Sequence, residues 1–226
     1  MVSNAQLGWI VGVFVGTLAS GTLAQFVFRH TYNRYTALIS AAGVAAATVA
    51  RQLLDGLDLL HVVIVPTLHR FDDRYDLRAH TLYLSSPQTA SVAALAVTAH
   101  EVGHAWQHEQ RYWALRWRRW VHALGHGGAL AALGAILMGW TYSNDALLTY
   151  GVWTYGGVVV LLLLGLPVEL DANRRALRLL VEGNLIRGRD ERRATRRLLS
   201  CALLTYISAA LNPAVHALFA LWQTRR

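Results

Sequence analysis

The sequence has no lysine, a single cysteine and few charged residues of either sign. Only 15% of its 226 residues are charged, whereas about 25% is usual in a soluble domain. The one cysteine, Cys201, excludes an internal disulfide and a cysteine-based zinc ribbon. Apolar residues are abundant, at 54% of the chain with 8 Trp and 9 Tyr, which excludes collagen, a coiled coil and intrinsic disorder. The composition predicts an integral membrane protein.

Four windows without Asp, Glu or Arg are long enough to cross about 30 Å of hydrocarbon as helices. They are residues 7–28, 121–142, 147–166 and 198–222. The first is expected to be an uncleaved anchor, because no basic segment precedes it as in a signal peptide. The last contains Asn212-Pro213, so it either spans the membrane or re-enters it. We therefore predict a mainly α integral membrane protein with about four transmembrane helices.

The 21 arginines bring the net charge to +8 and indicate how the chain is oriented. A basic chain can bind nucleic acid, but 19 of these arginines lie in residues 29–120 and 167–199. Two predicted spans separate these segments, which puts them on one face of the membrane, and clustered arginine is typical of the cytoplasmic face. Topology and the lipid bilayer account for the charge, so no nucleic-acid partner is expected. The sequence predicts a single multi-pass domain of the inner (cytoplasmic) membrane, with both segments and the active site in the cytoplasm.

The segment 29–120 combines helical and extended patterns. Apolar residues at three- and four-residue spacing predict a helix over residues 43–57, and a second helix is expected over residues 87–112. Residues 61–65 and 80–84 are rich in β-branched and aromatic side chains, which predicts a small β-hairpin. The polar run 70–78 lies between them, and its aspartates are interpreted as turn formers, because the Gly and Glu of an EF-hand loop are missing.

The most informative motif is His100-Glu101-Val102-Gly103-His104, in the second of these helices. Histidines at i and i+4 project from one face of a helix and can hold one tetrahedral Zn²⁺. Glu101 is then placed as the general base for a zinc-activated water, and it can pass the proton to the leaving amine. The motif predicts one bound Zn²⁺ and hydrolysis of a peptide bond.

A zinc site of this kind needs a third protein ligand and leaves the fourth position for water. His108 continues the series, but it lies about 12 Å along an unbroken helix from His100, so an outer or surface position is expected. Glu169, at the exit of the third window, is the better candidate, and Asn173 follows one turn later to orient a ligand. A second interpretation stays open, in which Glu169 pairs with one of the two arginines that follow Asn173.

Several motifs together carry a resemblance to a known family. They are Asp73-x-Tyr75-Asp76-x-Arg78, Leu82-x-Leu84-Ser85, Ser91-Val-Ala-Ala-Leu, Ala99-His100-Glu101-Val102-Gly103-His104-Ala105, Leu166-Pro167-Val168-Glu169 and Ala202-Leu203-Leu204-Thr205-Tyr206. The chain, from about residue 43 onward, resembles the neutral zinc metallopeptidases, small bacterial membrane proteins related to the HtpX and CAAX-prenyl-protease clan. The resemblance implies a zincin-like helical region of the gluzincin type, with Glu169 as the third zinc ligand. Asn173 then stands where the clan has an Asp.

Three further residues have alternative interpretations. His122 and His126 have no counterpart in the family pattern; their i,i+4 spacing could form a second metal site, and an interfacial or packing position is the alternative. Tyr206, in the last motif, is a candidate for stabilising the oxyanion or contacting substrate. A buried tyrosine between helices is the alternative for Tyr206.

These observations predict a membrane-bound, zinc-dependent endopeptidase that cleaves membrane proteins or membrane-proximal segments. An extended peptide substrate is expected to pair with the edge of the 80–84 strand. One alternative is a site-2-type intramembrane protease, which needs a Leu-Asp-Gly motif in a later span; the chain has Leu54-Asp55-Gly56 before its zinc motif. The other is a non-catalytic metal-binding membrane scaffold, against which the presence of Glu101 beside the ligands favours hydrolysis.

Overall fold

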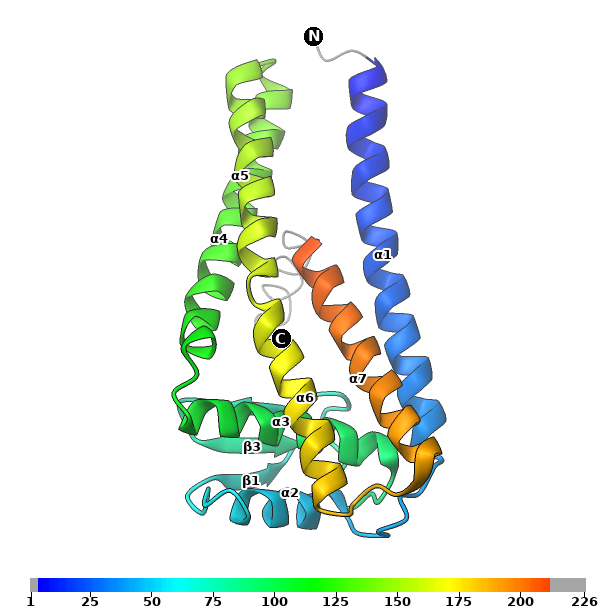
Figure 1. The fold of residues 1–226 in the computed structure, drawn as a ribbon. Helices are drawn as coiled ribbons and strands as arrows, with labels where there is room; N and C mark the ends of the chain where they lie inside the picture. The colour runs from blue at the N-terminus through cyan, green and yellow to red at the C-terminus, as the bar shows by residue number, and fades with distance from the viewer. Residues whose placement is uncertain (1–3, 212–226) are drawn as a thin grey trace. The chain divides into compact units, whose positions relative to one another are not determined.

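The structure, a computed structural model, describes residues 4–211, except the side chains of residues 4–18 and of Arg118, Arg119, His122, Ala123 and His126. The predictions for His122 and His126 therefore lie outside the described residues. Within the described range the chain forms seven helices and three strands (Figure 1). In chain order they are α1 (Asn4–Thr36), α2 (Ala46–Asp55), β1 (Val63–Pro66), β2 (Arg74–Asp76), β3 (Thr81–Leu84), α3 (Val92–Glu109), α4 (Trp113–Thr141), α5 (Asp145–Leu163), α6 (Leu166–Glu182) and α7 (Gly188–Leu211).

The chain divides into two compact units. Unit 1 contains α1 up to Phe26, the residues Arg116–Leu166 and the end of α7 from Leu204. Unit 2 contains Val27–Leu115 and Pro167–Leu203, and therefore holds the sheet, α2, α3 and almost all of α6. Most of the two arginine-rich stretches of the sequence thus fold together in unit 2.

The core of unit 2 forms where apolar faces of its helices meet the sheet. The helical spacing of apolar residues in α2 places Val49, Leu53 and Leu54 on one buried face. α3 and α6 contribute Leu95 and Leu180, which are fully buried in the same cluster. Burial of each such leucine stabilises the fold by about 1.5–3 kcal/mol. This core holds α3 and α6 together, and these two helices carry the predicted metal ligands.

The predicted β-hairpin is wrong, because β1 and β3 run parallel and belong to a three-stranded sheet of order β1-β3-β2. Parallel neighbours need a connection of about a dozen residues, and residues 67–80 supply it. Those residues also contain β2, which pairs antiparallel with β3 so that Tyr75 lies opposite Leu82. β2 lies within the polar run 70–78, which the sequence predicts to be a turn. Its strand pattern is hidden because two charged residues flank Tyr75. β3 is central, so the prediction that substrate pairs with its edge is also wrong.

The prediction of about four transmembrane helices is wrong for the residues that the structure describes. Among them, one continuous helical stretch, Asp145–Glu182, is long and apolar enough to cross a membrane. The described apolar part of the second window, Gly127–Thr141, falls short of that length, and the side chains of His122, Ala123 and His126 in this window lie outside the described residues. The described part of the fourth, residues 198–211, is about 21 Å long, less than the roughly 30 Å of a bilayer core. Side chains of residues 7–18 and all of residues 212–222, which complete the first and fourth windows, lie outside the described residues. With fewer spans, the arginine-rich segments 29–120 and 167–199 are no longer required to lie on one face of the membrane.

Unit 1 contains the helical pair α4 and α5 (Figure 1). Many of its large apolar side chains are exposed. The Asn144 side chain caps α5 by accepting the N–H of Leu147. The two helices approach closely at Gly151, where a Cβ would lie 2.8 Å from the backbone nitrogen of Ile136. The side of α5 away from this contact exposes large apolar residues such as Trp153, at 77%. Only 28% of the best apolar window of Asp145–Glu182 is buried.

Candidate metal centre

Two histidines on one face of α3 form the first part of the site. α3 begins at Val92, where the Ser91 side chain accepts a hydrogen bond from the N–H of Ala94 and caps the helix. One turn separates His100 from His104, so their rings lie side by side, with centroids 4.7 Å apart and planes at 81°. His104 is 4% exposed and His100 is half-buried. The i,i+4 spacing therefore produces a pair of imidazoles at the edge of the unit 2 core.

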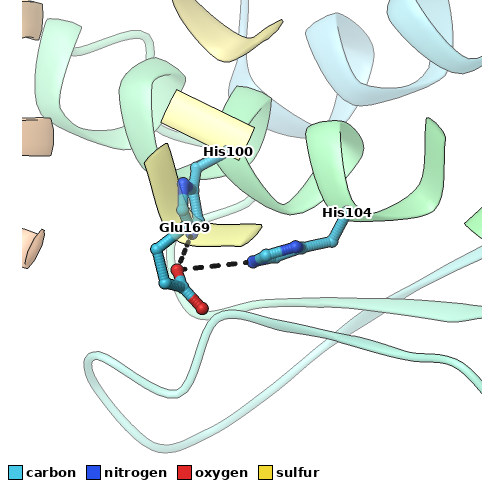
Figure 2. Close-up of side chains that lie close together, drawn as sticks. All are labelled: His100, His104 and Glu169. Carbon is cyan, nitrogen blue, oxygen red and sulfur yellow. Dashed lines mark ion pairs between the residues drawn. The ribbon is translucent and has the colours of Figure 1, made fainter. Parts of the chain in front are cut away.

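Glu169, in the first turn of α6, completes the cluster. Figure 2 shows both imidazoles directed at its carboxylate, whose Oε2 lies 3.3 Å from Nε2 of His100 and 3.7 Å from Nε2 of His104. One ligand atom from each of the three residues lies within 4.8 Å of the other two. Of the two interpretations of Glu169 in the sequence, the structure favours the ligand position. Among the described side chains no ion pair joins Glu169 to Arg174 or Arg175, and Arg175 pairs with Asp171 at 2.6 Å.

A glycine lets α6 approach α3 at this level. A Cβ on Gly103 would lie 3.0 Å from the carbonyl oxygen of Ala172 on α6, closer than most side chains tolerate. Gly103 stands between the two histidines on α3, and Ala172 is one turn after Glu169 on α6. The close contact of the two backbones therefore sets the distance at which Glu169 meets the histidines.

The ring of His100 is held in one tautomer by Asn173. The Nδ1 of His100 lies 2.8 Å from the side-chain oxygen of Asn173, and the Asn173 amide group donates to the carbonyl of Leu199 at 3.2 Å. The bond to Leu199 identifies which end of the amide is nitrogen. An amide oxygen only accepts, so the proton of the neutral His100 ring is on Nδ1, and the Nε2 lone pair is directed toward Glu169. Asn173 is thus placed to orient the ligand.

Gln107 holds His104 in the same way. Its side-chain oxygen lies 2.9 Å from Nδ1 of His104, and its amide nitrogen donates to the Val168 carbonyl at 2.9 Å and to the Asp171 carboxylate at 2.8 Å. Gln107 is fully buried. In their neutral forms both histidines would therefore carry the proton on Nδ1 and present an Nε2 lone pair to the same point, which is the arrangement that metal-binding histidines show.

The three residues fit a catalytic zinc ion. With bonds of about 2.0–2.2 Å and tetrahedral angles, zinc holds its ligand atoms about 3.4 Å apart, and the separations of 3.3 and 3.7 Å are close to this value. Two neutral imidazoles and one carboxylate are ligands that zinc accepts, and a set of three leaves one position open for water, as in catalytic rather than structural sites. His100, His104 and Glu169 would hold the ion.

Glu101 follows His100 on α3 and connects the helix to the sheet. Its Oε2 accepts the backbone N–H of Tyr75 in β2 at 2.8 Å. That N–H is directed away from β3, so β2 turns its outer edge toward α3. The bond fixes one carboxylate oxygen of Glu101, the residue that follows the candidate ligand His100.

His108 does not join the cluster of His100, His104 and Glu169. Its Nδ1 lies 3.0 Å from the hydroxyl of Tyr75, and its ring stacks on His80 with centroids 4.9 Å apart. Burial raises the pKa of the Tyr75 hydroxyl to about 12, helped by the negative charges of Glu109 and Asp76. These contacts place His108 outside the metal ligands, in the position expected for it.

Tyr206 lies in unit 1, whereas the cluster lies in unit 2. Its hydroxyl donates to the Leu162 carbonyl at 2.9 Å. The same hydroxyl packs against Gly165, at the position that a Cβ of residue 165 would take. The packing alternative describes this position, and nothing in these contacts supports an oxyanion role for Tyr206.

Two residues of the site were missed at the level of sequence. Gln107 stands three residues after His104, a spacing that brings side chains together on a helix, and this was the available signal. Asp171 points away from Glu169 along α6, yet it accepts from Gln107 and from Arg175. Its role depends on the contact between α3 and α6, which the sequence alone does not show.

Comparisons with known proteins agree with this site. A family model described as "Putative neutral zinc metallopeptidase" matches residues 10–224. The chain is 31% identical over 199 residues to the "Putative membrane protease YugP" of Bacillus subtilis (strain 168), an alignment that covers 87% of this chain and 88% of that protein. No solved structure matches the chain.

Proposed function

This chain belongs to the neutral zinc metallopeptidase family, and from that premise we propose that it is a membrane-bound zinc endopeptidase with Glu101 as its general base. The family membership confirms the resemblance seen in the motifs. The observation that carries the proposal is the cluster of two tautomer-fixed histidines and Glu169, with Glu101 one residue from a ligand. A structural zinc would have four protein ligands and no such neighbouring base.

The mechanism follows from what each side chain can do. Zinc, when bound, supplies a Lewis acid that polarises the substrate carbonyl and lowers the pKa of a water molecule. Glu101 takes the proton of the attacking water and delivers it to the leaving amine. Its Oε2 is held by the Tyr75 N–H at 2.8 Å, so the carboxylate cannot rotate freely and its other oxygen carries the proton. Asn173 and Gln107 keep the two imidazoles oriented throughout.

The substrate is a peptide that lies along the outer edge of β2. The Tyr75 N–H on this edge is engaged by Glu101 at 2.8 Å, so an added substrate strand would donate to the Tyr75 carbonyl on the same edge. β2 has only three residues, so it would fix a short stretch of substrate next to the general base. This edge replaces that of β3, which has a neighbour on both sides.

Membrane-protein substrates are proposed because the chain carries a lipid-compatible helix. The stretch Asp145–Glu182 meets the length and composition of a span, and α5 exposes Trp153 and Val160 at 77% and 61%. Soluble monomers seldom expose large contiguous apolar surfaces. Sixteen of the 21 arginines lie in unit 2, and because arginine is enriched on the cytoplasmic side of membrane proteins, this bias supports our proposal that unit 2 lies on the cytoplasmic side.

The site-2 alternative would need Asp55 to act as a metal ligand. Asp55 ends α2, its side chain is 48% exposed, and it pairs with Arg51 at 2.7 Å. It is not a member of the His100, His104 and Glu169 cluster. No contact of Asp55 favours this alternative. The remaining alternative, a non-catalytic scaffold, is distinguished from a peptidase by the following experiment.

The test compares membranes from cells that express the wild type, Glu101→Gln or Glu109→Gln. Glu109 is an exposed residue at the end of the same helix, so the last variant is a matched control. We expect equal zinc in all three purified proteins, and peptides from cleaved membrane proteins only with the wild type and the control. Identical peptide patterns for the wild type and Glu101→Gln would contradict the proposal and favour the scaffold.

A further inference from the structure

A cavity of about 650 Å³ lies in unit 2 between the last turns of α1 and the first turns of α7. Its size falls in the range of pockets for small molecules. Thr31 on α1 and Ser200 on α7 contribute hydroxyl groups to its wall. None of its lining residues belongs to the metal cluster of His100, His104 and Glu169, so the cavity is a separate feature of the same unit.

The wall of this cavity is dominated by arginine. Six arginines line it and no aspartate or glutamate does; they are Arg34, Arg189, Arg192, Arg193, Arg196 and Arg197. Five of the six come from α7, at spacings of three and four residues that put them on one side of the helix. Like charges at i,i+4 destabilise a helix, so this stripe works against the folding of α7 unless an anion compensates it.

The acidic residues of unit 2 do not supply that compensation. Among the ion pairs of the described side chains, none joins a carboxylate to any of the five α7 arginines. Glu191 lies among these arginines in α7, but its two carboxylate oxygens accept the backbone N–H groups of Ala41 and Arg187, at 2.7 and 2.6 Å. Glu191 is thus engaged by the backbone and leaves the arginine side chains to another anion.

We propose that this cavity binds a phosphate group that carries two or more negative charges, such as a phosphomonoester or a pyrophosphate. The guanidinium fork matches phosphate oxygens with paired, charge-assisted hydrogen bonds, and the hydroxyls of Thr31 and Ser200 can donate to the same oxygens. Several arginines around one concave site select for multiple charge, whereas a flat basic surface attracts any anion. The phosphate can belong to a lipid headgroup such as phosphatidic acid or to a soluble metabolite.

The test measures binding of inorganic pyrophosphate to the full chain in uncharged detergent micelles by titration calorimetry. The cavity variant is Arg193→Gln/Arg196→Gln. The control, Arg174→Gln/Arg178→Gln, removes the same charge from exposed positions of α6 outside the cavity. We expect saturable binding by the wild type, binding at least about tenfold weaker in the cavity variant, and control binding within twofold of the wild type. Thermal unfolding of each protein, without ligand, verifies that the variants fold.

A second arm identifies the source of the phosphate. Two lipids compete with pyrophosphate in separate micelles of equal total charge. One is short-chain phosphatidic acid, a phosphomonoester, and the other is phosphatidylglycerol, whose phosphodiester carries a single negative charge. Displacement of pyrophosphate by phosphatidic acid alone supports a headgroup site, and displacement by neither lipid supports a soluble ligand. The proposal is overturned if pyrophosphate does not bind, if the control loses as much affinity as the cavity variant, or if both lipids displace pyrophosphate equally.

Discussion

Replacing Gln107 by methionine tests whether the buried amide beside His104 tunes the metal site. Methionine has a similar volume and flexible packing, so the change removes the polar contacts and leaves no large void. Gln107 is fully buried and makes three hydrogen bonds, to His104, Val168 and Asp171, at 2.9, 2.9 and 2.8 Å. All three are lost in the variant, and the Nδ1–H of His104 loses Gln107 as its acceptor.

The expected magnitude follows from these contacts. A buried donor left without its acceptor costs about 1–3 kcal/mol, so the metal-free variant should unfold more easily by about that amount. Loss of the group that orients a metal-binding histidine typically weakens metal affinity about 10–100-fold, which corresponds to roughly 1.4–2.7 kcal/mol. His104 itself remains, so the loss should stay below that of removing a ligand.

The assay is a zinc titration against a chromophoric chelator, with thermal unfolding of the metal-free protein alongside. Gln52→Met is the matched control, because Gln52 is exposed on α2, and it should change neither quantity. If the Gln107 variant unfolds as expected but binds zinc within twofold of the wild type, the amide does not orient His104 for metal, and the argument from tautomers is refuted.

Three further predictions concern the same unit. Glu101→Gln should lower turnover by about 10²–10⁴-fold with zinc content unchanged by metal analysis; near-normal turnover would remove Glu101 from proton transfer. The pKa of Tyr75 is raised from 10.0 to about 12, so its contribution to stability is complete below pH 10 and is lost as the pH rises through 12. Tyr75→Phe should therefore unfold with less dependence on pH over this interval in denaturant titrations, and an unchanged slope would contradict the shift. Gly103→Ala should push Ala172 away, since a Cβ would lie 3.0 Å from its carbonyl, and weaken zinc binding in a chelator competition, while unaltered affinity would show that α6 adjusts freely.

The local part of the site could be predicted from the sequence, and the part made by tertiary contacts could not. The spacing of His100 and His104 fixes their relation on any helix, so the motif alone indicated two of the three donors. Glu169 lies 65 positions further along the chain, and its approach depends on the contact of Gly103 with Ala172. Sequence spacing left the role of Glu169 open between a metal ligand and an ion pair with an arginine. The resemblance to a known family strengthened the ligand interpretation.

The sheet and the spans show the same limit for different reasons. β1 and β3 had recognisable strand composition, but their parallel pairing depends on how residues 67–80 fold back, which no local pattern contains. β2 was missed because only Tyr75 of its three residues is buried. Charge-free windows overstated the number of spans, because the absence of charge does not show that a helix is long and apolar enough to cross a membrane; among the described residues, Asp145–Glu182 alone meets that test.

The measurement that tests the central claim most directly is the zinc content of Glu169→Ala after dialysis. His108→Ala and Glu182→Ala serve as controls, the first a nearby histidine outside the cluster and the second an exposed glutamate at the end of the same helix. The account predicts one zinc per chain for the wild type and both controls, and for Glu169→Ala an affinity lowered by more than the 10–100-fold typical of an orienting residue. Retention of zinc by Glu169→Ala, or its loss from His108→Ala, would contradict the account.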